Sequence, residues 1–201
     1  MITLRGQIDR LRKSGYGAFF RPGDAAQAGI TYHQIQQLVA VGEVERLSRG
    51  LYRLTSVEPT ENYSLAAACA RIPRAVVCLL SALRVHDIGT QVTRDVWIAI
   101  PHGTKAPRES GFRLRLVRFS GAALKYGVVP ISFEGVAARI TNPTRTVLDC
   151  FRYERLVGRE AAREALRDAL RQRLVTVDGL YRATEVLPSR RLRAVLDATA
   201  G

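Results

Sequence analysis

The sequence predicts an α+β protein, in which an N-terminal winged helix-turn-helix precedes a C-terminal α/β domain with a central sheet and a helical C-terminal part. The first 54 residues have the element order helix, strand, helix, helix, strand, strand. Short apolar strands occupy the middle of the chain, and apolar residues recur at helical spacing after residue 141. A length of 201 residues suffices for two domains with separate cores. We place these domains at residues 1–58 and 59–201.

The first predicted helix, residues 3–14, carries leucine and isoleucine at helical spacing between charged residues. A strand-like run follows at residues 18–21. Pro22 then opens a short helix, and Gly29 makes the turn into the next one. Two helices joined by such a turn form a helix-turn-helix.

The second helix of this motif is expected at residues 31–41. Thr31 can cap it, Gln34 three residues later can complete a capping box, and Gly42 ends it. Three apolar residues at i, i+3 and i+4 form its core-facing stripe: Ile35, Leu38 and Val39. The opposite face is polar, uncharged and able to hydrogen-bond, and it comprises His33, Gln36, Gln37 and Ala40.

Two short strands, residues 43–47 and 51–54, follow around a tip that contains Arg49 and Gly50, which predicts a wing. A helix fits the major groove, where glutamine can bond bidentately to adenine, and arginine is favoured at phosphates and in the minor groove. We expect His33 and Gln37 to reach deepest. The predicted DNA-binding residues are Arg21, Thr31, Tyr32, His33, Gln36, Gln37, Arg46, Arg49 and Arg53.

The formal net charge of +13 indicates a polyanionic partner. Nucleic acid is favoured over a membrane surface, because no amphipathic basic helix stands out. The positive charge is spread over both predicted domains, so the second domain is also expected to contact anions.

The three cysteines share no CxxC spacing, so neither a disulfide framework nor a zinc site is expected. No long apolar run and no leader-like start is found, which predicts a cytoplasmic protein without a membrane partner. The histidines lie far apart, and no lysine has an acidic residue two positions before it. We therefore expect no catalytic residues, metal or cofactor.

The second domain is expected to begin after an alanine-rich helix at residues 63–71, which Pro73 ends. Ser81 is expected to cap a helix that runs to residue 88. A basic, turn-rich loop is predicted at residues 101–111. The predicted strands lie at residues 75–80, 96–100, 113–119, 128–133 and 136–140.

From residue 142 the pattern becomes helical, with Asn142 as the cap and Pro143 at the first helical position. Gly158 ends this segment. Further helices are predicted at residues 159–173, 177–187 and 189–198.

Several blocks together carry a family resemblance: AFFRPGDAAQAGI, VERLSRGLYRL, VVCLLSALRVHDIGTQ, DVWIAI, LRLVRFSGAAL, and NPTRTVLDCFRY followed by ALRDALRQR. Over about residues 15–175 the chain resembles the AbiE-type (AbiEi family) antitoxins of type IV toxin-antitoxin systems, in a compact two-domain form. One departure is that Gln36 and Gln37 stand where many relatives carry basic residues.

The resemblance implies a winged helix that binds inverted repeats in its own promoter and represses the operon. It also implies a C-terminal domain that counteracts a nucleotidyltransferase-like toxin, directly or through the toxin's substrate. Two alternatives remain open: a winged-helix module that binds proteins only, and a stand-alone transcriptional regulator without a toxin partner.

Within the second domain, Arg145 and Arg152 lie seven positions apart and are expected on nearly the same helix face. Asp149 is positioned to pair with Arg145, which leaves Arg152 without a partner in its own helix. The arginines from residue 159 onward follow acids at helical spacing and are expected to form a solvated, ion-paired face. The predicted antitoxin surface is Lys105, Arg108, Arg145 and Arg152.

Overall fold

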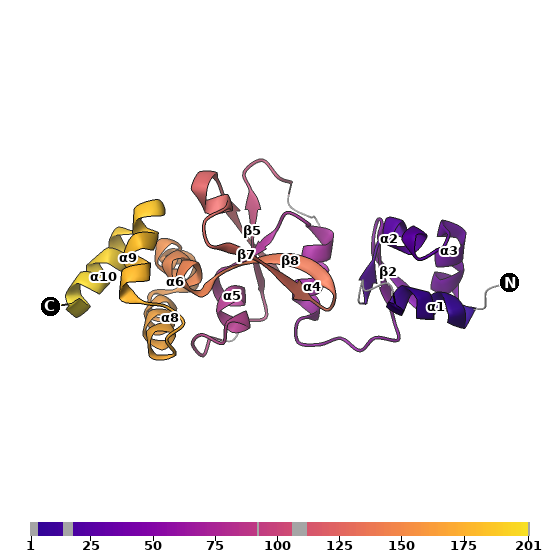
Figure 1. The fold of residues 1–201 in the computed structure, drawn as a ribbon, viewed down its shortest axis with the longest axis horizontal. Helices are drawn as coiled ribbons and strands as arrows, with labels where there is room; N and C mark the ends of the chain where they lie inside the picture. Colours follow the sequence, from indigo (N-terminus) through magenta and orange to yellow (C-terminus); the bar gives the residue numbers. More distant parts are fainter. Residues whose placement is uncertain (1–3, 14–17, 92, 106–111, 201) are drawn as a thin grey trace. The chain divides into compact units, whose positions relative to one another are not determined.

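The computed structural model describes residues 4–13, 18–91, 93–105 and 112–200, and it confirms the α+β class (Figure 1). The chain divides into two compact units, Met1–Pro73 with Ile131–Ala138, and Arg74–Pro130 with Arg139–Gly201. The first unit is longer than the predicted domain of residues 1–58, because it includes a further helix and a hairpin tip. A functional boundary at residue 58 stays a prediction.

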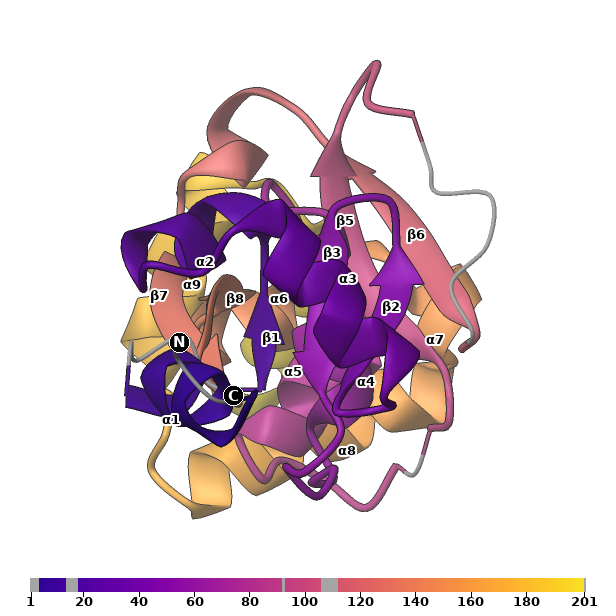
Figure 2. The ribbon, with the colours of Figure 1, turned by 90° about the vertical axis from the view of Figure 1, so that its right-hand side faces the viewer.

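The first unit has the predicted order of helices and strands (Figure 2). Its strands form an antiparallel sheet of order β1-β3-β2. Its elements are α1 (Leu4–Lys13), β1 (Phe19–Phe20), α2 (Pro22–Gln27), α3 (Tyr32–Ala40), β2 (Val44–Ser48), β3 (Leu51–Leu54) and α4 (Tyr63–Arg71).

One apolar core joins these helices to the sheet. Ile35 and Leu38 of α3 are completely buried and pack with Leu11 of α1, Phe20 of β1 and Leu54 of β3. Burying an aliphatic side chain of this size contributes about 1.5–3 kcal/mol. Because this stripe holds α3 against the sheet, the side chains on the opposite face are not part of the apolar core.

The two ends of α3 have local causes, as predicted. The Gln34 N–H donates to Thr31 Oγ1 at 3.3 Å, and the Thr31 N–H donates to Gln34 Oε1 at 2.8 Å, which confirms the capping box. Gly42 has a φ of +79°, a conformation that residues with a Cβ rarely adopt, and it turns the chain from α3 into the wing. Both bounds are therefore set within a few residues of the helix.

The second unit is built on a five-stranded sheet of order β6-β5-β4-β8-β7. Strand β4 pairs antiparallel with β5 and parallel with β8, while β5 and β6 are parallel. The strands are β4 (Val76–Val77), β5 (Val96–Pro101), β6 (Leu114–Phe119), β7 (Val128–Phe133) and β8 (Val136–Thr141). The tip of the β7-β8 hairpin is grouped with the first unit.

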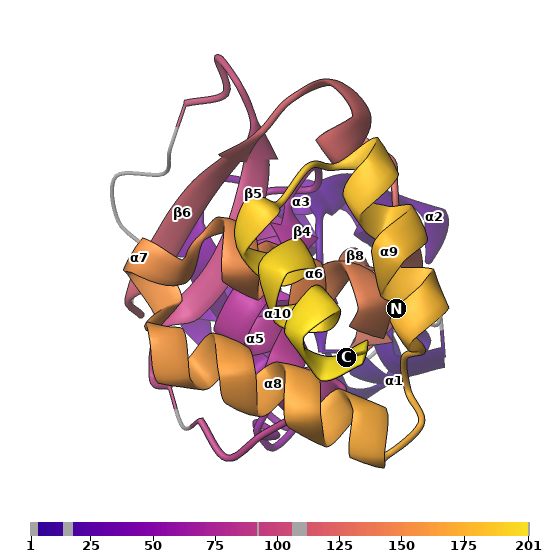
Figure 3. The same ribbon diagram turned by 90° about the vertical axis from the view of Figure 1, so that its left-hand side faces the viewer.

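Helices cover one face of this sheet, and α6 lies among α5, α8, α9 and α10 (Figure 3). The side chains of Trp97, Ala99 and Phe119 extend from the sheet into the same core. The helices are α5 (Leu79–Val85), α6 (Pro143–Arg152), α7 (Glu154–Val157), α8 (Arg159–Arg171), α9 (Val177–Val186) and α10 (Arg190–Ala200), with a 3-10 turn at Gly121–Leu124.

The prediction for the start of α5 was wrong. The strand before it ends at Val77 instead of residue 80, the helix begins at Leu79, and Cys78 occupies the cap position. Ser81 is therefore inside the helix, where its hydroxyl accepts the Trp97 N–H at 2.9 Å. The short polar side chain joins α5 to β5 instead of capping the helix.

A buried ion pair anchors α6. Arg145 and Asp149 both have fully buried side chains, and Arg145 Nε donates to Asp149 Oδ2 at 2.8 Å. The guanidinium also donates to the Tyr126 carbonyl at 2.6 Å and lies 4.7 Å from the Phe119 ring centroid. Asp149 Oδ1 in turn accepts from Arg152 Nη1 at 2.9 Å.

These contacts correct two expectations. Arg145 is 0% exposed, so it is not part of a surface. Arg152 does have a partner in its own helix, since Asp149 has two carboxylate oxygens and serves both arginines. Burial raises the pKa of the Asp149 carboxyl, and the charges of the two arginines act against that rise.

We predict that Arg145→Ala lowers the free energy of unfolding by about 3–5 kcal/mol, because it leaves the Asp149 charge buried with one of its two partners removed. Urea unfolding of the full chain measures this change. The matched control is Arg182→Ala, which removes an exposed pair with Asp178 at the same four-residue spacing and should cost about 0.3–0.5 kcal/mol. Similar losses in both variants would contradict a structural role for the buried pair.

Candidate nucleic-acid interface

The outward face of α3 carries most of the predicted DNA-reading residues. Tyr32, His33 and Gln37 are exposed, with Tyr32 at 57%. Thr31 is also exposed, but its hydroxyl is used by the helix cap. The structure thus presents an exposed helix face with hydrogen-bonding side chains next to the wing, and α3 packs against β2.

Gln36 differs from its neighbours, because it is partly covered and hydrogen-bonded. Its Nε2 donates to the Tyr52 hydroxyl at 3.3 Å. The neighbouring Tyr52 side chain raises the pKa of Tyr32 above its ordinary value. The aromatic ring of Tyr52 stacks on Phe20, with ring centroids 5.8 Å apart. Sequence analysis missed Tyr52, because its role depends on strand pairing.

The wing displays two of its three predicted arginines. Arg46 in β2 and Arg49 in the turn are exposed, and Arg46 is the register partner of Tyr52. Guanidinium groups in these places are suited to phosphate contacts. The wing therefore adds positive charge beside a helix face that has none.

The expectation for Arg53 was wrong. Arg53 is 6% exposed. Its guanidinium lies 5.1 Å from the Tyr63 ring centroid, and its Nη2 donates to the Val57 carbonyl. The reason is that both faces of β3 are covered: all four residues of the strand are buried, and Arg53 lies against Tyr63 of α4. Alternation along the strand alone did not indicate that both faces are covered.

Arg21 is exposed and stands directly before α2, at its cap position. Its guanidinium donates to the Ala70 carbonyl of α4, so part of its hydrogen-bonding capacity is used inside the first unit. The Arg21 backbone N–H donates to Asp24 Oδ2 at 2.7 Å, which helps to start α2. We therefore assign Arg21 a structural role, through its contact with α4, ahead of a role in DNA binding.

The predicted antitoxin surface is not assembled as one patch. Lys105 is exposed in the loop that follows β5, Arg108 lies outside the described residues, and Arg145 is buried. Arg152 is partly exposed, pairs with Asp149, and lies 5.8 Å from the Tyr153 ring centroid. Of the four residues, only Lys105 and Arg152 are shown in contact with solvent.

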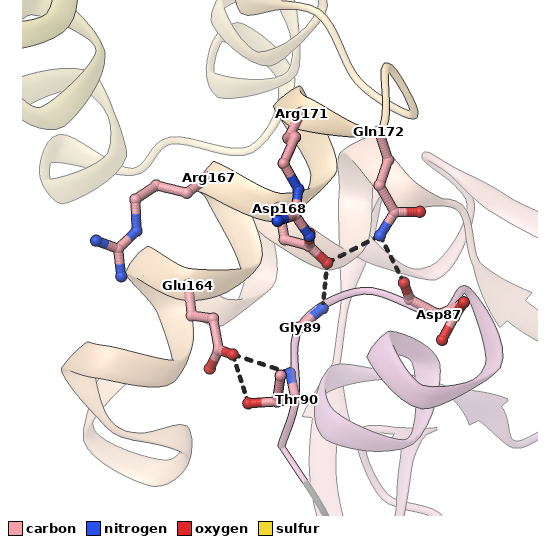
Figure 4. A pocket seen from close by; sticks show the side chains of 8 residues that line it. All are labelled: Asp87, Gly89, Thr90, Glu164, Arg167, Asp168, Arg171 and Gln172. Atoms are coloured by element: carbon pink, nitrogen blue, oxygen red, sulfur yellow. Dashed lines mark hydrogen bonds and ion pairs between the residues drawn. The ribbon is translucent and has the colours of Figure 1, made fainter.

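Sequence analysis also missed a polar cavity of about 510 Å³ between α8 and the loop after α5 (Figure 4). Glu164 accepts the Thr90 backbone N–H at 2.9 Å and its hydroxyl at 2.6 Å. Asp168 accepts the Gly89 N–H at 2.6 Å. The expected ion pair exists between Asp168 and Arg171, but Glu164 is hydrogen-bonded to the loop instead. These two carboxylates attach the loop to the helix.

Three further observations concern metal sites, histidines and membrane spans. In the part of the chain that the structure describes, no group of three or more His, Cys, Asp or Glu residues is placed to hold a metal ion. One of the three histidines, His86, has its Nε2 2.6 Å from the Thr141 carbonyl oxygen. None of the described helices has the length and apolar composition needed to cross a membrane.

An exposed polar helix beside a basic hairpin, with α1, α2 and α3 packed on the β1-β3-β2 sheet, defines a winged helix-turn-helix protein. Residues 7–55 match a family model described as "Transcriptional regulator, AbiEi antitoxin". This match confirms, over that segment, the resemblance to AbiEi-type antitoxins and transcriptional regulators.

No curated protein sequence matches this chain. Among solved structures, the RV2827C protein from Mycobacterium tuberculosis is similar, with a TM-score of 0.62. The alignment covers 95% of this chain and 76% of that chain at 13% sequence identity. At this identity the similarity concerns the fold alone.

We predict that acid releases the loop that Glu164 and Asp168 hold. The hydrogen bond from the Thr90 side chain lowers the pKa of Glu164, and the Gly89 N–H lowers the pKa of Asp168. The pKa values of both carboxyls are lower in the folded protein than in the unfolded chain. The hydrogen bonds that attach the loop to α8 are therefore complete above the ordinary carboxyl pKa values, and they are lost as pH falls through the lowered pKa values. An NMR titration of the Gly89 and Thr90 amides from about pH 6 to pH 2 measures this.

The variant Glu164→Gln tests the assignment of that titration. It should abolish most of the acid response at Thr90 and leave the response at Gly89 in place, because Asp168 is unchanged. Midpoints at or above the ordinary carboxyl values would contradict the hydrogen-bond assignment.

Proposed function

We propose that this protein is an autorepressor and antitoxin of a toxin-antitoxin operon. The first unit binds inverted repeats in the protein's own promoter, in the cytoplasm, and the second unit counteracts a nucleotidyltransferase-like toxin. The observation that carries the proposal is the exposed, hydrogen-bonding face of α3 beside the arginines of the wing, in the segment that matches the AbiEi regulator model.

The division of labour on this surface follows from groove chemistry. Arg49 and Arg46 supply charge at the wing, where a phosphate contact strengthens binding to every sequence. The side chains of Gln37 and His33 supply donors and acceptors without charge, which suits contacts with base edges. An uncharged recognition helix relies on the wing for electrostatic attraction, so the two parts are expected to act together.

The first functional prediction separates affinity from specificity. Arg49→Ala should weaken binding to promoter and random duplexes alike and reduce the salt dependence by about one phosphate contact, a slope change of roughly 0.9. Gln37→Ala should relax preference at one base pair, by about 1–3 kcal/mol if its contact is bidentate. Gel shifts with promoter and scrambled duplexes at two salt concentrations measure both effects.

Arg173→Ala is the matched control, because it removes an exposed arginine from the second unit. It should leave the preference for the promoter unchanged. Equal affinity of the wild-type protein for promoter and scrambled duplexes would remove the repressor proposal and favour a module that binds proteins only.

The second functional prediction concerns antitoxicity. Lys105 and Arg152 are the members of the predicted surface that reach solvent among the described residues, and cationic side chains fit an acidic toxin face or an RNA bound with it. We expect a nucleotidyltransferase reading frame next to the gene. Co-expression of that toxin with Lys105→Ala/Arg152→Ala should fail to rescue growth, while promoter repression persists.

A melting temperature close to that of the wild type is required of the double variant, since Arg152 also pairs with Asp149. The comparison variant is Arg182→Ala, which removes an exposed arginine of α9 and should rescue growth fully. Full rescue by a stable Lys105→Ala/Arg152→Ala protein would place the neutralising surface elsewhere.

A further inference from the structure

A cluster of hydroxyl and amide groups joins α3 to the wing. Gln36 and Tyr32 lie four residues apart, hence on one side of the helix. The Gln36 amide donates to the Tyr52 hydroxyl at 3.3 Å, and the Tyr52 side chain next to Tyr32 raises the pKa of Tyr32. Tyr52 lies in the central strand β3, is 1% exposed, and is fixed by its stacked contact with Phe20. The side chain of Gln36 is therefore hydrogen-bonded to an immobile partner. We call Tyr32, Gln36 and Tyr52 the hydroxyl cluster.

The cluster changes what Gln36 can do at a base pair. A glutamine side chain on a helix surface samples several rotamers, and ordering it on binding costs up to about 2 kcal/mol. The bond to Tyr52 orders Gln36 before DNA arrives, so that this cost is smaller on binding. In the described part of the chain no hydrogen bond holds the side chain of the neighbouring Gln37, which is exposed and bears the full cost.

The bond to Tyr52 uses one of the two N–H groups of the Gln36 amide. The second N–H and the carbonyl oxygen remain, and a donor next to an acceptor is the combination that adenine N7 and N6 match in the major groove. A group whose direction is set by its neighbours discriminates more sharply between base pairs than one that can readjust.

We infer that Tyr52 is a positioning residue for sequence recognition: it holds Gln36 in one orientation, which makes Gln36 the main specificity-determining residue of α3. This inference rests on the proposed DNA-binding function. It departs from the expectation that His33 and Gln37 reach deepest, because it ranks the helix residues by how firmly they are held instead of by exposure.

The experiment uses the full-length chain and Tyr52→Phe, which removes one oxygen and keeps the ring that stacks on Phe20. Dissociation constants are measured by fluorescence anisotropy for the promoter duplex, for its single-base-pair variants and for a random duplex. We expect promoter affinity to fall roughly five- to tenfold, the loss of preference to concentrate at one base pair, and random-duplex affinity to stay unchanged.

Combining substitutions distinguishes positioning from a general structural effect. Tyr52→Phe added to Gln36→Ala should cause no further loss, because the amide that Tyr52 holds is already gone. Tyr52→Phe added to Gln37→Ala should multiply the two separate losses.

Losses that multiply in the Tyr52→Phe/Gln36→Ala protein, or equal weakening of promoter and random duplexes by Tyr52→Phe, would overturn the inference and leave the proposed function standing. A wild-type protein without preference for its promoter would instead remove the proposed function, and the inference with it.

Discussion

The second unit depends on one buried charge pair. Arg145 and Asp149 are both out of contact with solvent, so each requires a partner of opposite charge and hydrogen bonds for its remaining polar atoms. That requirement joins α6 to the turn before β7, through the Tyr126 carbonyl. It also explains Gly127, where a Cβ would lie 2.6 Å from the Arg145 Cβ. A cation that sequence analysis assigned to a surface is thus an internal constraint on the fold.

The first unit follows a different principle, in which structure and recognition use opposite sides of one helix. The buried stripe and the capping box hold α3, and nothing in the core requires its outer residues to be polar. The side chains of those outer residues are therefore available to contact a ligand. The hydrogen bond from Gln36 to Tyr52 links this helix to the wing, so that the two elements proposed to contact DNA share one rigid support.

The predictions that held depend on signals within a few residues of each other. Thr31 and Asn142 cap their helices, since each side chain accepts a backbone N–H three residues later. The helix at Tyr63–Arg71 has the predicted bounds, because Pro73 and a run of alanines act locally. The failures at Ser81 and Arg53 have a common cause. Each side chain meets a partner from another element, and helical or strand spacing contains no information about that partner.

By itself, the sequence determined the α+β class, the order of the elements, most of their bounds and the uncharged face of α3, because these depend on backbone conformation and on short-range periodicity. Only the tertiary structure decided which polar side chains are available to a partner. It placed Arg145 against Phe119 and Gln36 against Tyr52, pairs that are 26 and 16 positions apart in the chain. Burial removes water as the competing hydrogen-bond partner, so the packing of distant elements determines whether a polar residue supports the fold or remains free to bind.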